Sequence, residues 1–183
     1  MFETDDDANF RKFNNEVFES LERGHSDGVK VDNLVLEINS SRHAYAVTQS
    51  QVVQSVMASI LQLGASQLED ISHESSAGAK KLLLEVKKMV KMFVELLLKY
   101  VKTSGAQVDC LKALESTCLE ESQFLPIIAK IIEDLHDKEI LEEDAILKWF
   151  NNICHSTDVK ARVQPFIDWL MDSDEDDEES DDE

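Results

Sequence analysis

Apolar side chains recur at spacings of three and four residues along most of the chain, and this pattern constrains the fold more than any other feature. Phe10, Phe13 and Val17 share one helical face, and a cleaner stripe of the same kind runs over residues 124–135. Only five glycines and two prolines interrupt 183 residues. We therefore predict an all-α fold of about seven to nine antiparallel helices joined by short loops.

The expected helices cover about residues 8–23, 33–45, 48–64, 79–103, 108–118, 124–135, 146–153 and 158–171. Gly24 is expected to end the first, Asn33 to cap the second, and the Ser104-Gly105 pair to separate the fourth from the fifth. Short connections favour a HEAT-like stack of helix pairs, with an irregular bundle as the alternative, because no fixed repeat is visible. We expect one helical domain over residues 1–171.

An acidic tail follows the last apolar stretch. Ten of the twelve residues from Asp172 to Glu183 are acidic, and we expect this segment to be disordered because it repels itself and has nothing to bury. The tail accounts for half of the net charge of −20, so residues 1–171 still carry −10. Direct binding to nucleic acid is therefore not expected. The tail is suited to catching lysine-rich segments, or else it only raises solubility.

The motifs of nucleotide-binding, metal-dependent and hydrolytic enzymes are absent from the sequence. The five histidines are scattered, the three cysteines have no CxxC spacing, and no glycine-rich phosphate loop occurs. We expect no cofactor and no metal. The apolar stretch from Leu82 to Val101 contains six charged residues, so we interpret it as a core helix and not a membrane span. Function is expected to lie in binding surfaces, in a cytoplasmic protein.

Residues 33–45 contain an unusual pair. At about 100° per residue, Leu34, Ile38 and Tyr45 fall on the face expected to be buried, whereas Leu36 points nearly the opposite way and Glu37 lies at the flank. An exposed leucine beside a carboxylate is a candidate contact patch. The alternative is that another helix covers Leu36.

Two segments near the C-terminus combine aromatic and acidic residues: EEDAILKWF, residues 142–150, and FIDWLMDSDEDDEES, residues 166–180. The stripe that contains Trp149 and Phe150 favours a core position for both side chains, with solvated carboxylates beside them. Trp169 is expected to be partly buried and to anchor the last helix. Together the two segments can hold a basic partner through charge and through its aliphatic lysine stems.

These segments resemble the paired aromatic and acidic boxes of the W2 domain, a HEAT-like module of translation factors. NLVLEINSSRHAYAVT, residues 33–48, looks specifically like the W2 domain of the epsilon subunit of the guanine-nucleotide exchange factor for eukaryotic initiation factor two. The resemblance covers essentially the whole chain, although residues 66–120 carry no matching motif. The full family subunit also has N-terminal regions through which it meets the other subunits of its complex, so we expect this chain to be a catalytic segment.

The resemblance implies exchange activity: release of GDP from the gamma, G-protein subunit of initiation factor two, while the boxes hold lysine-rich blocks of its beta subunit. Glu37 is implied as critical for exchange, with Leu36 beside it. The implied partner-binding residues are Glu142, Glu143, Asp144, Trp149, Phe166, Asp168, Trp169, Asp172, Asp174, Glu175, Asp176, Asp177, Glu178 and Glu179. Two alternatives stay open: a GTPase-regulating or adaptor W2 domain like that of initiation factor five, which needs no role for Glu37, and an acidic histone-binding-like adaptor, which needs only the tail.

Overall fold

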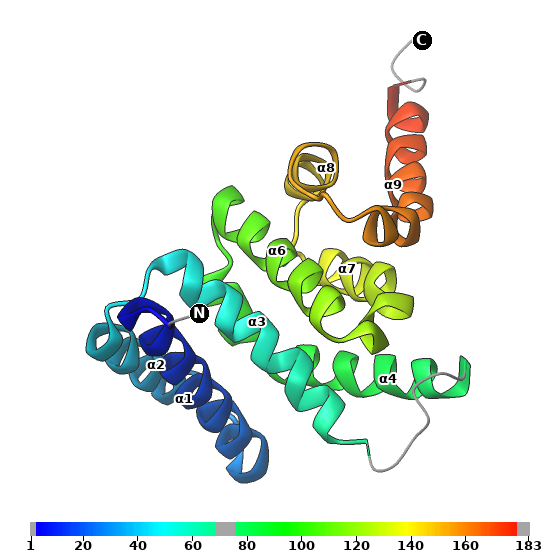
Figure 1. Cartoon of the computed structure of the whole chain (residues 1–183). Helices are drawn as coiled ribbons and strands as arrows, with labels where there is room; N and C mark the ends of the chain where they lie inside the picture. Colours follow the sequence, from blue (N-terminus) through cyan, green and yellow to red (C-terminus); the bar gives the residue numbers. More distant parts are fainter. Residues whose placement is uncertain (1–2, 69–75, 179–183) are drawn as a thin grey trace.

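The computed structural model describes residues 3–68 and 76–178, and over these residues the backbone forms nine α-helices, one short 3-10 helix and no strand (Figure 1). The elements are α1 (Asp5–Asp27), α2 (Val31–Tyr45), α3 (Gln49–Ser66), α4 (Ser76–Met92), α5 (Val94–Tyr100), α6 (Ser104–Glu120), η1 (Ser122–Ile127), α7 (Ile128–Asp137), α8 (Glu143–Asn152) and α9 (Thr157–Glu178). The predicted all-α, HEAT-like fold is confirmed.

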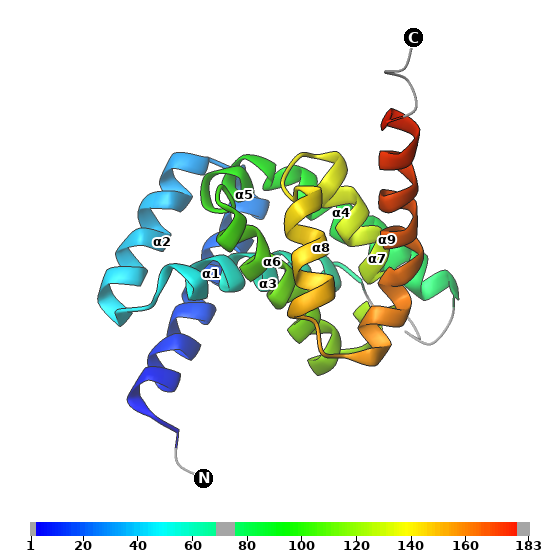
Figure 2. The ribbon, with the colours of Figure 1, turned by 90° about the horizontal axis from the view of Figure 1, so that it is seen from above.

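Helix α3 lies at the centre of the packing. It contacts α1, α4 and α6, while α2 packs on α1, α8 on α6, and α9 on α7. Figures 1 and 2 show the α1–α2 pair at one end of the molecule and α9 at the other. The two ends therefore present separate surfaces.

One continuous apolar core runs through these helices. Phe13 of α1, Phe93 between α4 and α5, Phe124 of η1 and Trp149 of α8 are all fully buried in it. Because most of the apolar stripes predicted from the sequence supply its side chains, the helical periodicity located the core correctly. Over the described residues, no helix is both long and apolar enough to cross a membrane.

The first two helix boundaries differ from those predicted. Gly24 lies inside α1, where Leu34 and Phe93 pack on it, and the helix ends instead at Gly28, whose φ of 96° suits glycine. Helix α2 begins at Val31 after Lys30, which makes no side-chain capping hydrogen bond, so Asn33 is not the cap. A glycine at a close helix contact and a glycine at a helix end look alike in sequence.

The helix predicted over residues 79–103 is two helices. Phe93 has φ −103° and ψ 18°, and the chain breaks there between α4 and α5 while this side chain stays fully buried. The stripe at 124–135 likewise divides into η1 and α7, because Pro126 lacks the N–H that an α-helix would use. Ser104 and Gly105 begin α6 behind the cap Thr103, whose hydroxyl accepts from the Ala106 N–H at 3.1 Å.

Other ends agree with the sequence. The Thr48 hydroxyl accepts from the Gln51 N–H at 3.2 Å, and the Gln51 side chain accepts from the Thr48 N–H at 2.9 Å, which is a complete capping box at the start of α3. The last helix, however, continues to Glu178 and does not end near residue 171. The disorder predicted for residues 172–183 stays a prediction.

Candidate functional site

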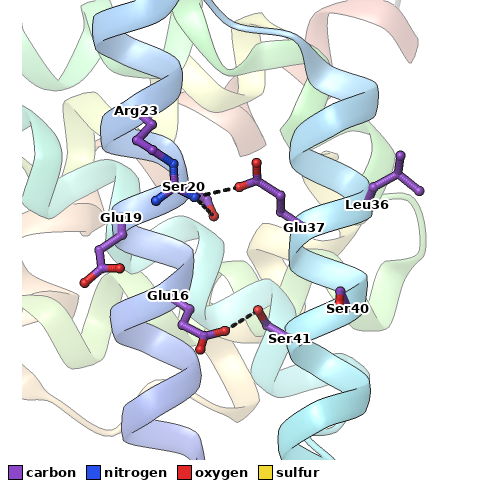
Figure 3. Close-up of a pocket in the computed structure, with 8 residues that line it drawn as sticks. All are labelled: Glu16, Glu19, Ser20, Arg23, Leu36, Glu37, Ser40 and Ser41. Atoms are coloured by element: carbon purple, nitrogen blue, oxygen red, sulfur yellow. Dashed lines mark hydrogen bonds and ion pairs between the residues drawn. The ribbon is translucent and has the colours of Figure 1, made fainter.

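A surface groove between α1 and α2 contains the pair singled out in the sequence (Figure 3). Residues of both helices line it: Glu16, Glu19, Ser20, Arg23, Leu36, Glu37, Ser40 and Ser41. Its volume is about 500 Å³. The groove is thus shaped by the way α1 packs on α2.

The exposure predicted for Leu36 is confirmed. Leu34 and Ile38 are buried on the core face of α2, whereas the Leu36 side chain is 69% exposed. In Figure 3 it points away from α1. Because Leu36 is this exposed and lies next to an exposed carboxylate, a partner can contact an apolar and a charged group at the same place.

Glu37 faces α1 and forms an ion pair with Arg23, with 2.9 Å between Arg23 Nη2 and Glu37 Oε2. The same Nη2 donates to Ser20 Oγ at 3.3 Å. Both charged side chains remain about half exposed, so the pair is a surface pair that contributes little to stability, roughly 0 to 1 kcal/mol. Glu37 can therefore leave Arg23 and pair with another cation at a small cost in free energy.

Glu16 fixes α2 against α1. Its carboxylate accepts hydrogen bonds from the Ser41 hydroxyl and, at 2.7 Å, from the Tyr45 hydroxyl. These bonds, Ser41's foremost, lower the pKa of Glu16 below its usual range because they favour the charged form. Three carboxylates, those of Glu16, Glu19 and Glu37, line a groove that has Arg23 as its cation among the lining residues. The groove is therefore suited to a basic group.

The first aromatic and acidic segment is mostly structural. Trp149 is fully buried, as predicted, and its indole Nε1 donates to Glu115 Oε2 at 3.3 Å. Glu142 lies at the start of α8, where its N–H donates to Gln107 Oε1 at 2.8 Å. Asp144 is exposed and Glu143 partly so. Of the partner-binding residues predicted in this segment, only the carboxylates are accessible, because Trp149 is buried.

The second segment differs from the prediction at Trp169. This side chain is 57% exposed and does not anchor α9 in the core. It stacks on Phe166, with ring centroids 5.8 Å apart and planes 18° apart, while Phe166 is buried and meets His136 edge-on at 6.1 Å. The reason is angular: Phe166 and Leu170 take the core face of α9, which leaves Trp169 at its edge.

Trp169 and Phe166 line a niche between α7 and α9 together with Ala129, Lys130, Glu133 and Pro165. Asp168 and Asp172 are exposed nearby on α9, and Asp168 accepts from Gln164 Nε2 at 2.8 Å. The backbone of Asp174, Glu175, Asp176, Asp177 and Glu178 continues α9, and Glu179 lies outside the described residues.

The structure separates the predicted residues into two regions. Leu36 and Glu37 lie on α2, whereas the aromatic and acidic residues lie on α8 and α9, apart from α2 (Figure 1). Sequence reasoning missed Glu16, Arg23 and Glu115, whose partners are 14 to 41 residues away along the chain. No local pattern marks such contacts.

Within the described residues no group of three metal-ligating side chains lies close enough to hold an ion. Cys110, Cys118 and Cys154 are free and buried. Burial raises the pKa of Cys110 and of Cys118 to about 12, so these thiols stay protonated at neutral pH. They read as core side chains.

Comparison with known proteins assigns the C-terminal part of the chain. Residues 106–180 match the family model described as W2 of eIF4-gamma, eIF5 and eIF2-epsilon. This part of the chain is similar to W2 domains. The match includes both aromatic and acidic segments, on α8 and α9, and nearly all of α6 together with η1 and α7.

Two groups of relatives appear among similar proteins. The chain is 26% identical over 168 residues to translation initiation factor eIF2B subunit epsilon of Dictyostelium discoideum, which covers 90% of this chain and 23% of that protein. It is 37% identical over 75 residues to probable eukaryotic translation initiation factor 5-1 of Arabidopsis thaliana, covering 40% and 17% respectively. The chain thus spans less than a quarter of either relative.

Proposed function

We propose that this W2 chain promotes guanine-nucleotide exchange on translation initiation factor two, releasing GDP from the gamma subunit while its acidic and aromatic segments hold lysine-rich segments of the beta subunit. The proposed exchange surface is Leu36 and Glu37 with the groove beside them. The observation that carries the proposal is the match to the eIF2B epsilon subunit. Because it covers 90% of the chain, it necessarily runs through α2.

The geometry supports a mechanism by competition. An exchange factor lowers nucleotide affinity by binding the empty G domain more tightly than the occupied one, and this coupling is reciprocal. Glu37 offers a carboxylate that can replace phosphate oxygens at a lysine, or disturb a magnesium ion, once it leaves Arg23. Leu36 supplies an apolar contact next to it. Neither residue is needed for the core, so both are free to serve a partner.

The test compares two exposed carboxylates of α2. Glu37→Ala and Asp32→Ala each remove one charge and one surface ion pair, since Asp32 pairs with Lys99 at 2.7 Å. We expect Glu37→Ala to abolish most of the acceleration of labelled GDP release from initiation factor two, and Asp32→Ala to retain it. Melting temperature should change little in Glu37→Ala, because exposed positions typically affect stability by about 0.5 kcal/mol or less.

The proposal fails if the two variants lose activity equally, or if activity falls only in proportion to lost helicity. Leu36→Ala against Leu119→Ala, a similarly exposed leucine on α6, repeats the comparison for the apolar contact.

A second candidate is a non-catalytic adaptor or GTPase-regulating W2 domain. It is favoured by the relatives of the eIF5 group, whose matches reach 37% identity over a shorter part of the chain. Such a domain uses the aromatic and acidic segments but not Glu37. Unchanged GDP release together with intact binding to initiation factor two would identify it.

A further inference from the structure

Helix α4 presents a basic face on an otherwise acidic protein. It contains five lysines and one glutamate, a net charge of +4, while the whole chain carries −20. The lysines are Lys80, Lys81, Lys87, Lys88 and Lys91. More than a quarter of the chain's 18 basic residues therefore lie on one helix.

The five lysines lie on the same side of α4. At about 100° per residue they fall within a sector of about 120°, and Leu84 falls inside that sector. Four of the lysines are exposed and Lys87 is half-buried, whereas Leu82, Val86 and Met89 occupy the opposite, core-facing side. Leu84 is 54% exposed, so a leucine lies in the middle of the lysine face.

Among the residues that the structure describes, few carboxylates neutralise this face. Lys88 pairs with Glu85 at 2.8 Å, but across residues 3–68 and 76–178 the other four lysines form no ion pair with a carboxylate. The acidic end of α9 does not approach it: Figure 1 shows the described end of α9 well separated from α4. In the same view, α3 lies between α4 and the α1–α2 pair. The lysine face is thus a third surface, independent of the two used above.

We propose that the lysine face of α4 is a docking surface for an acidic segment of another protein, a segment that also carries apolar side chains. Charge complementarity supplies the attraction. A row of lysines alone would bind any polyanion, but Leu84 adds an apolar contact at the centre that only a segment with apolar side chains can use. Nucleic acid is disfavoured because its binding rests on backbone phosphates, which offer Leu84 no apolar partner. A second copy of this chain would bring its whole net charge of −20 to the contact, whereas a short acidic segment brings only a few charges, so self-association is opposed more strongly.

The test uses a fluorescein-labelled peptide of repeating Glu-Glu-Leu, a peptide of equal charge in which glycine replaces leucine, and a single-stranded oligouridine. Binding to the whole chain is followed by fluorescence anisotropy. The variants are Lys80→Glu with Lys91→Glu, and Leu84→Ala. The matched control is Lys12→Glu with Lys112→Glu, which makes the same charge change at exposed positions of α1 and α6.

We expect the α4 charge reversal to lower the affinity for the leucine peptide by about tenfold or more, and the control variant to change that affinity by less than about twofold. The wild type should prefer the leucine peptide to the glycine peptide, and Leu84→Ala should remove that preference. Equal weakening by both double variants would show only a net-charge effect and overturn the proposal. Tighter binding of oligouridine, reduced by the α4 reversal but not by Leu84→Ala, would overturn it in favour of nucleic acid. Because every altered side chain is exposed, unchanged melting temperatures are expected throughout.

Discussion

The two tryptophans show how much a single side chain's role depends on its environment. Trp149 is fully buried with its indole N–H bonded to Glu115, whereas Trp169 is more than half exposed and stacks on Phe166. Both lie in aromatic and acidic segments that look equivalent in sequence. The first therefore belongs to the core, and the second leaves an aromatic surface exposed, where we propose that a partner binds.

Alanine substitutions should separate these roles. Trp149→Ala is expected to cost about 3–5 kcal/mol, as for other buried large side chains, while Trp169→Ala should lose only its stacking, about 0.5–1.5 kcal/mol. Urea denaturation measures the cost, and titration with a lysine-rich peptide measures binding. Trp169→Ala should bind the peptide clearly more weakly although it stays folded. A Trp169 variant that unfolds as readily as the Trp149 variant would contradict this assignment.

At the scale of elements, close helix contacts matter more than helix propensity. Gly64 lies near the end of α3, where α3 crosses α4: a Cβ there would meet Val86 Cα at 3.1 Å. A Cβ added at Gly105, in the first turn of α6, would meet only Thr103 Oγ1, at 3.9 Å. The same residue type serves packing at one site and has no packing role at the other.

Glycine-to-alanine substitutions at these two positions should therefore change the free energy of unfolding in opposite directions. Gly64→Ala is expected to destabilise by about 1–3 kcal/mol, because the backbone of α4 must move. Gly105→Ala should be neutral or stabilise by up to about 1 kcal/mol, because alanine favours the helix and has space. Thermal unfolding of the two variants decides it. Equal effects would mean that the contact with Val86 relaxes freely.

The whole molecule combines an acidic body, a strongly acidic C-terminal segment and one helix, α4, that carries five lysines. With a net charge of −20, long-range attraction for basic partners follows from the sequence. Such attraction acts mainly on association, and salt screens it beyond a Debye length of about 8 Å at physiological ionic strength. The affinity for a basic partner that remains at high salt must therefore come from contacts with the folded surfaces.

Deleting residues 172–183 should lower the affinity for a lysine-rich peptide at low salt, chiefly through a smaller association rate constant. The same deletion should change the affinity much less at high salt. Trp169→Ala, in contrast, should weaken binding at both salt concentrations, because an aromatic contact is not screened. Stopped-flow titrations at two salt concentrations make the comparison. Equal affinities of the intact and shortened chains at low salt would reduce the tail to a solubilising segment.

Much of the fold followed from the sequence because helical periodicity records which face of each segment is buried. The core side chains Phe13, Ile60 and Trp149 and the exposed Leu36 were all assigned correctly on that basis. Helix ends were predicted less well, since Gly24, Phe93 and Pro126 acquire their meaning from what packs against them or from their place in a tertiary turn. A local pattern contains no information about such neighbours.

The sequence by itself determined the all-α class, the apolar stripes, the charge distribution and the place of the Leu36–Glu37 pair on the outer side of its helix, because each depends on residue type and spacing alone. Only the tertiary structure decided that Arg23 holds Glu37, that Glu16 joins α1 to α2, and that Trp169 lies in the open. It also decided that α4 lies apart from the described end of α9. These outcomes depend on how helices far apart in the chain pack, and that arrangement is set by the shared core.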